Sequence, residues 1–147
     1  MNSQSEVDNF LVVLKNGFNL DNRSQQFKIW NQFAEKNKFL VAETIANLDP
    51  CENEVFWNFL EAILDNIVYW QDFILDQLNR LIEAANSTTH VCPVLSSLGA
   101  FEMLIDIPDN DFLKEVASVL KASLTTKNAQ LKEFLLWLLT GITFKAN

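Results

Sequence analysis

Between Cys51 and Asn86 the chain contains no Gly, Pro, Ser or Thr, and the whole sequence of 147 residues has only three Gly and three Pro. A sheet needs many turns, which use these residues, whereas helices with short connections do not. The sequence therefore predicts an all-α fold. We expect one domain over residues 1–147, a helical bundle or a short α-solenoid-like array of about six to eight helices.

Short sequence signals mark several helix boundaries. Ser5–Asp8 resembles a capping box, and Gly17 is placed to end the first helix. Asp49 is predicted to cap a later helix that has Pro50 at its first position. Gly141 is predicted to end the last helix.

Two signals concern the second half of the chain. Gly99 lies inside an apolar helical stretch that begins near Pro93. An interior glycine of this kind indicates a close helix crossing. Beyond Pro108, either Asp109 or Asn110 is predicted to cap the next helix.

The longest uninterrupted segment repeats every eleven residues. Its apolar residues are Phe56, Ile67, Leu78; Phe59, Trp70, Leu81; and Ile63, Ile74, Ala85. Because eleven residues are close to three helical turns, the pattern favours one long helix, or two segments meeting in line, over residues 50–86. A helical hairpin remains the alternative, since a turn can leave the helical phase intact.

Negative charge is concentrated in the middle of the chain. The net charge is −8, yet residues 39–113 alone hold thirteen acids and one base, Arg80. Six acids of the long segment fall within about 60° of one helical face, and Arg80 is expected to be their intrahelical counter-ion. These acids and two flanking aromatics form the predicted partner-binding site: Glu54, Trp57, Glu61, Asp65, Tyr69, Asp72, Asp76, Glu83.

Like charges at this spacing destabilise a helix, so stability alone does not explain the stripe. An acidic face beside aromatic side chains is typical of a surface that binds a basic protein. Two other interpretations stay open. The acids could serve only solubility, or bases from the first and last helices could fold over them.

The sequence offers no set of residues for catalysis, for a metal or for a cofactor. The single His, His90, makes at most half a metal site with Cys92. Cys51 is expected to be an inert thiol because acidic neighbours oppose the thiolate. The acid pairs on the long segment are expected to be solvated rather than catalytic. We therefore predict a protein that is not an enzyme.

Other partners and compartments are restricted by composition. The negative net charge disfavours nucleic acid, and no apolar run reaches the length of a membrane span. The first ten residues lack the pattern of a secretory signal, so we expect a cytoplasmic protein with free cysteines.

A small, acidic, all-helical chain with this stripe is similar to the immunity proteins of contact-dependent growth inhibition systems. The resemblance lies in size, in the absence of a visible signal peptide and in the acidic stripe. It implies a basic protein partner, a toxin domain of the nuclease kind, whose active site the carboxylates would block. An aromatic such as Trp57 or Tyr69 would fill a pocket on that toxin.

A second hypothesis needs no acidic site. The chain could be a non-enzymatic helical adaptor or scaffold that binds its partner through an apolar groove, for example between the last two helices. A homodimer that buries the aromatic flank of the stripe is a variant of this hypothesis.

Overall fold

The computed structural model describes residues 3–18 and 20–146, and within them the chain forms α- and 3₁₀-helices (η) and no strand. The predicted all-α bundle of six to eight helices is thus confirmed. In chain order the elements are α1 Ser3–Asn16, η1 Leu20–Asn22, α2 Arg23–Lys36, α3 Lys38–Ala46, α4 Asn53–Ile63, η2 Leu64–Trp70, α5 Gln71–Ser87, α6 Val91–Leu98, η3 Gly99–Asp106, α7 Asn110–Ala122, η4 Ser123–Thr125 and α8 Ala129–Ala146.

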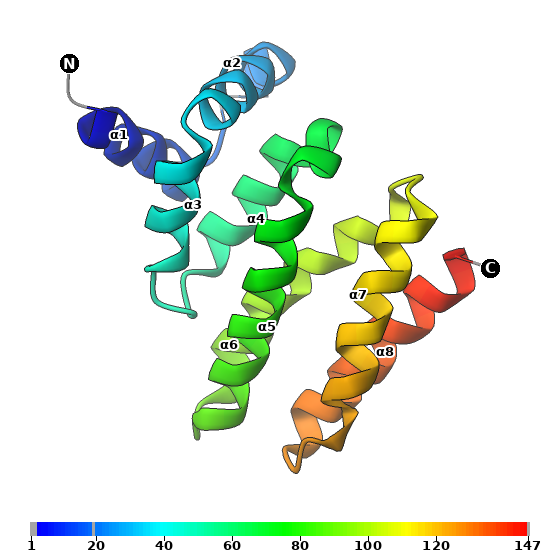
Figure 1. Ribbon diagram of the computed structural model, residues 1–147. Coiled ribbons are helices and arrows are strands. Elements are labelled where there is room, and N and C mark those ends of the chain that lie inside the picture. Colours follow the sequence, from blue (N-terminus) through cyan, green and yellow to red (C-terminus); the bar gives the residue numbers. More distant parts are fainter. Residues whose placement is uncertain (1–2, 19, 147) are drawn as a thin grey trace.

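The helices form three neighbouring groups (Figure 1). The first three helices lie together at the N-terminal side, α4, α5 and α6 occupy the middle, and α7 packs along α8 at the C-terminal side. Gly17 has a φ of 81° and follows α1, as predicted, because only glycine adopts this conformation at little cost. An aromatic cluster joins the first group to α4, with Phe10 stacked on Trp30 and edge-on to Phe59.

The prediction of a rod over residues 50–86 is wrong. The chain leaves the helical path at Asn66, where φ is −125° and ψ is 34°, and α5 then runs back past α4 (Figure 1). The rings of Phe59 and Phe73 lie 5.6 Å apart, whereas fourteen residues of a straight helix span about 21 Å. The structure therefore has the helical hairpin that the sequence left as an alternative.

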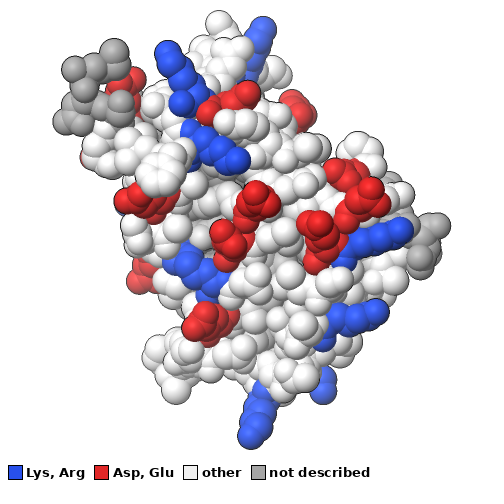
Figure 2. Space-filling view, viewed as in Figure 1, with Lys and Arg blue, Asp and Glu red and all other residues white. Residues whose placement is uncertain are grey.

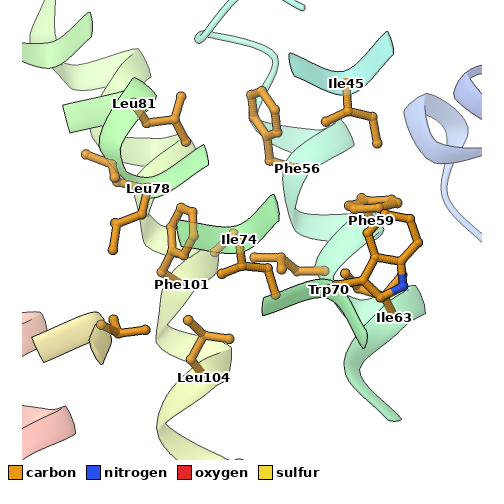
Figure 3. Close-up of a cluster of buried hydrophobic side chains, with 14 of the residues drawn as sticks. Ile45, Phe56, Phe59, Ile63, Trp70, Ile74, Leu78, Leu81, Phe101 and Leu104 are labelled. Atoms are coloured by element: carbon orange, nitrogen blue, oxygen red, sulfur yellow. The ribbon is translucent and has the colours of Figure 1, made fainter. Parts of the chain in front are cut away.

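The hairpin buries the apolar face that the eleven-residue repeat defines. All nine apolar residues of that repeat are buried, from Phe56 to Ala85. In a lone rod this face would lie in water, and burial of such surface stabilises a fold by about 25 cal/mol per Å². Figure 3 shows the resulting cluster, in which side chains of α4 and α5 meet Phe101 and Leu104 of η3.

The segment before α4 differs from the prediction. Asp49 does not cap α4; its carboxylate accepts a hydrogen bond from the backbone N–H of Cys51 at 2.9 Å, in a separate turn. The helix begins only at Asn53. The side chain of an Asp bonds its neighbouring backbone equally well in a turn and in a cap, so the sequence signal is ambiguous.

In the C-terminal half, Asp109 caps α7 as predicted and accepts a hydrogen bond from the Phe112 N–H at 3.0 Å. Gly141 does not end the last helix, because α8 continues to Ala146. A Cβ at Gly141 would lie 2.8 Å from the terminal methyl of Ile105. This glycine therefore permits a close approach between α8 and η3.

Candidate functional site

The reversal at Asn66 divides the predicted stripe among three elements. Glu54, Trp57 and Glu61 lie on α4, Asp65 and Tyr69 on η2, and Asp72, Asp76 and Glu83 on α5. The estimate of one 60° sector assumed a single helix axis, and the structure has two. The prediction of six aligned carboxylates along one rod is therefore wrong, and each part is described by its own contacts.

Glu61 is neutralised within the chain. Its carboxylate forms a salt bridge with the guanidinium of Arg23 on α2, the one salt bridge among the side chains that the structure describes. Arg23 also lies over the ring of Phe27, 4.8 Å from its centroid. The sequence left open that bases of the first and last helices cover the stripe; here the covering base comes from α2 instead.

Asp65 is exposed at the edge of a polar cleft between α2 and the α4–η2 segment. The cleft has a volume of about 480 Å³, and the carboxylates of Glu35, Glu61 and Asp65 and the ammonium of Lys28 line it together with amide side chains. Glu35 accepts a hydrogen bond from the Asn66 side chain at 2.9 Å. Two of the three carboxylates thus have partners within the chain.

Trp57 connects α4 to α6. Its indole N–H donates to the Ser96 carbonyl at 2.8 Å, and its ring lies against Gly99, where a Cβ would come within 3.2 Å. The predicted close crossing at Gly99 is confirmed. Although the side chain is 38% exposed, its polar atom is committed to the fold. Glu54 is exposed nearby, in a shallow cleft that Trp57 and Lys15 also line.

Tyr69 is held by Lys38 at the start of α3. The Lys38 ammonium lies 4.3 Å from the centre of the Tyr69 ring and donates to the Tyr69 carbonyl at 2.7 Å. The two aromatic residues predicted to anchor a partner therefore both make intramolecular contacts. The sequence could not show that Lys38 contacts Tyr69 or that α6 contacts Trp57.

Arg80 does not neutralise its helical neighbours. Its guanidinium donates to the carbonyl oxygens of Leu48 at 3.3 Å and Ile45 at 3.4 Å, at the C-terminal end of α3, and to the side-chain oxygen of Gln77 at 2.9 Å. The expected role as counter-ion to Asp76 and Glu83 is therefore wrong. The carbonyl end of a helix attracts a cation, and burial lowers the pKa of Arg80.

The three acids of α5 share one helix and, like Glu54 and Asp65, form no salt bridge within the described residues. Asp72, Asp76 and Glu83 are exposed, and no salt bridge to them occurs within the described residues. In the view of Figure 2, acidic side chains are spread along α5 and over the neighbouring end of α7. We call these three residues the α5 acidic face.

Sequence reasoning did not locate the exposed apolar residues of α8. Leu136 and Trp137 are 44% and 52% exposed and line a groove of about 400 Å³ with Ile105, Thr140 and Gly141. The signal was present in part, because Leu136 and Trp137 lie outside the apolar helical face that the spacing of Leu131, Phe134, Leu135 and Leu138 predicts. What the sequence could not supply was the position of η3 beside α8.

The cysteines and the histidine stay apart from any ligand set. Cys51, Cys92 and His90 are exposed, and the described part of the chain has no group of three or more His, Cys, Asp or Glu residues arranged to hold a metal. Partial desolvation of this exposed thiol, followed by the hydrogen bond and charge of Asp49 and the charge of Glu52, raises the pKa of Cys51. A raised thiol pKa is the opposite of what a nucleophilic cysteine requires.

Comparisons of the chain with protein-family models, with curated proteins and with solved structures found no match. Within residues 3–18 and 20–146, no helix combines the length and the apolar character needed to cross a membrane.

Proposed function

We propose that this chain is a non-enzymatic inhibitor of the immunity-protein kind, which binds a basic protein partner, a toxin domain of the nuclease class, through the α5 acidic face. The observation that carries the proposal is the orientation of Arg80. This residue is the one base of residues 39–113, and its guanidinium is directed to the carbonyls of Ile45 and Leu48. Asp72, Asp76 and Glu83 form no salt bridge within the described part of the chain.

Stability accounts for Asp72, which lies in the first turn of α5, but not for its pairing with Asp76. Asp72 and Asp76 are four residues apart on the same helix, and like charges at this spacing destabilise a helix by about 0.2–0.5 kcal/mol per pair. A binding role accounts for it, because exposed charge of one sign speeds association with a partner of the opposite sign and rejects others.

The chemistry of the partner follows from the same charges. A nuclease binds the phosphates of its substrate with Lys and Arg, and carboxylates on a rigid helix can occupy those side chains in place of phosphate. The proposal therefore involves no cofactor, no catalytic residue and no nucleic acid. It places the chain in the cytoplasm, where it would block the active site of the toxin.

The test begins with capture of partners from the native host at low and at high salt, followed by association kinetics with the captured basic protein. The variant Asp72→Lys, Asp76→Lys, Glu83→Lys is expected to slow association about tenfold or more and to weaken its salt dependence. The matched control Glu102→Lys, Asp106→Lys, Asp111→Lys changes three exposed acids of η3 and α7 and gives the same net charge.

The control variant is expected to associate at close to the rate of the unchanged chain. Equal slowing by both variants would show that net charge alone matters, and an unaffected α5 variant would remove the α5 acidic face from the proposal. Circular dichroism and urea unfolding of each variant separate a loss of binding from a loss of fold.

One observation favours the second candidate, a helical adaptor. The groove beside Trp137 and Leu136 is the apolar surface that such a protein needs, and the apolar face of a partner helix is the ligand of that shape and chemistry. In that case Trp137→Ala would abolish capture of the partner. Binding would then depend weakly on salt, and the α5 variant would bind normally.

A further inference from the structure

The reversal between α4 and α5 contains no residue that prevents a continuous helix. Its sequence, LDNIVYW, has neither Gly nor Pro, and no residue in it has a positive φ. The backbone is bent at Ile63 (φ −103°, ψ 3°), Asn66 (φ −125°, ψ 34°) and Trp70 (φ −107°, ψ 10°). Since each has a negative φ, the segment can become α-helix by changes of some tens of degrees in φ and ψ, without passing through positive φ.

The apolar residues on both sides of the reversal stay in helical phase. Residues eleven apart, such as Phe59 and Trp70 or Ile63 and Ile74, are buried in the hairpin and would share one face of a straight helix. A straight helix with this face exposed would not be stable alone in water. To be stable, the straight helix would have to pack this apolar face against a second apolar surface, such as the same face of another copy.

One aromatic contact of the hairpin is symmetric about Asn66. Phe59 and Phe73 pack ring against ring at 5.6 Å, and each is seven residues from Asn66. If two straight helices cross antiparallel at Asn66, Phe59 of one copy therefore meets Phe73 of the other. The contact that closes the hairpin can thus form equally well between two chains.

We propose that residues 64–70 are a hinge, and that two copies of this chain exchange their α1–α4 parts by straightening it into a domain-swapped dimer. The contacts between the exchanged part and the remainder would all form again between copies. They include Trp57 with Ser96, Pro50 with Ser97 and Leu48 with Arg80.

Only the contacts of the hinge itself differ between the monomer and the swapped dimer. These include the hydrogen bonds from Asn66 and Tyr69 to Glu35, the contacts of Lys38 with Tyr69 and Trp70, and the packing of Trp70 on Phe59. Because all other interfaces are common to both forms, their balance depends on how readily the hinge becomes helical. An α4 helix of the same sequence fills this position in both forms. It belongs to the same chain in the monomer and to the other chain in the swapped dimer.

The hinge is tested with two substitutions at one site, Asn66→Ala and Asn66→Gly. Both remove the side-chain hydrogen bond to Glu35, and they differ in helix propensity. Alanine favours an interior helical position about fivefold over glycine, and each dimer has two hinges, so the dimer association constant is expected to be about 25-fold higher for Asn66→Ala. It is measured by analytical ultracentrifugation over a concentration series after refolding of the full chain at high concentration.

Exchange of α4 is then distinguished from other kinds of dimer with two single variants, Trp57→Ala and Gly99→Leu. In Gly99→Leu the new side chain meets Trp57 of the same molecule, because a Cβ there already comes within 3.2 Å of that ring. When the two variants are refolded together, a swapped heterodimer places the leucine of one chain against the alanine of the other. At the other crossing of this heterodimer, Trp57 of the Gly99→Leu chain meets Gly99 of the Trp57→Ala chain, as in the unchanged protein.

The proposal predicts that the mixture forms more dimer than either variant alone, and that native mass spectrometry identifies this dimer as the heterodimer. Equal association constants for Asn66→Ala and Asn66→Gly, or dimers that pair the two variants at random, would overturn it. A chain that stays monomeric with Asn66→Ala after concentrated refolding would do the same.

Discussion

The guanidinium of Arg80 on α5 donates to the carbonyl oxygen of Leu48 at 3.3 Å, thirty-two residues earlier in the chain. This contact joins the middle of the bundle to the C-terminal end of α3. It also removes the one base of residues 39–113 from the acids of its own helix. The Arg80 side chain thus connects α5 to the end of α3. Because it forms no salt bridge with Asp76 or Glu83, the α5 acidic face keeps its negative charge.

Arg80→Ala is expected to lower the free energy of unfolding by about 1.5–3 kcal/mol, the range for hydrogen bonds to charged groups. The carbonyls of Ile45 and Leu48 would lose their donor. Urea unfolding followed by circular dichroism measures the change. Lys114→Ala, at an exposed position of α7, is the control and is expected to change stability by less than about 0.5 kcal/mol. An equally small effect for Arg80→Ala would show that water replaces the guanidinium.

Gly99→Leu is expected to destabilise the chain by about 1–3 kcal/mol, because the added side chain is forced against the ring of Trp57. The ring cannot move aside easily, since its N–H is bonded to the Ser96 carbonyl. The double variant Trp57→Ala, Gly99→Leu should be more stable than the sum of the two single effects. A double-mutant cycle in urea measures this coupling, and strictly additive effects would contradict the contact.

Cys51 is expected to react with iodoacetamide more slowly than an unperturbed thiol near neutral pH. Partial desolvation, followed by the hydrogen bond and charge of Asp49 and the charge of Glu52, raises the pKa of this thiol, so less thiolate is present at a given pH. The rate should rise with pH until it passes the raised pKa. Asp49→Asn in a Cys92→Ser background should shift that profile to lower pH, and an unchanged profile would exclude the role of Asp49.

Asp76→Gln is expected to raise the free energy of unfolding of the isolated chain by about 0.2–0.5 kcal/mol, because it removes the repulsion from Asp72. Thermal unfolding at low and high salt measures it, and the gain should shrink as salt screens the pair. Glu115→Gln on α7 serves as a comparison at another exposed acid. A loss of stability in Asp76→Gln would mean that the α5 acidic face contributes to the fold.

Local features of the fold were predictable because they depend on neighbouring residues. The scarcity of breakers predicts the all-α class, Gly17 has the positive φ that its place after α1 indicates, and Asp109 caps α7. Gly99 lies at the predicted crossing. In each case, a backbone conformation or the lack of a side chain is a property of the residue itself.

The path of residues 50–86 and the acidic site built on it were not predictable in this way. A helical pattern with no breaker is compatible with both a rod and a hairpin. The angles between the acids could be compared only if all of them lay on one helix axis. Whether this segment forms a rod or a hairpin depends on what covers its apolar face. In the structure, the apolar side chains of α4 and α5 pack against each other and against η3 (Figure 3).

The sequence by itself thus determined the helices, most of their inward faces and the concentration of negative charge in the middle of the chain. The tertiary structure alone decided which of those charges remain free. Arg23 approaches Glu61 from α2, Lys38 approaches Tyr69 from α3, and Arg80 is directed to the end of α3. Ion pairs and caps between distant segments depend on helix packing, and no local pattern encodes it.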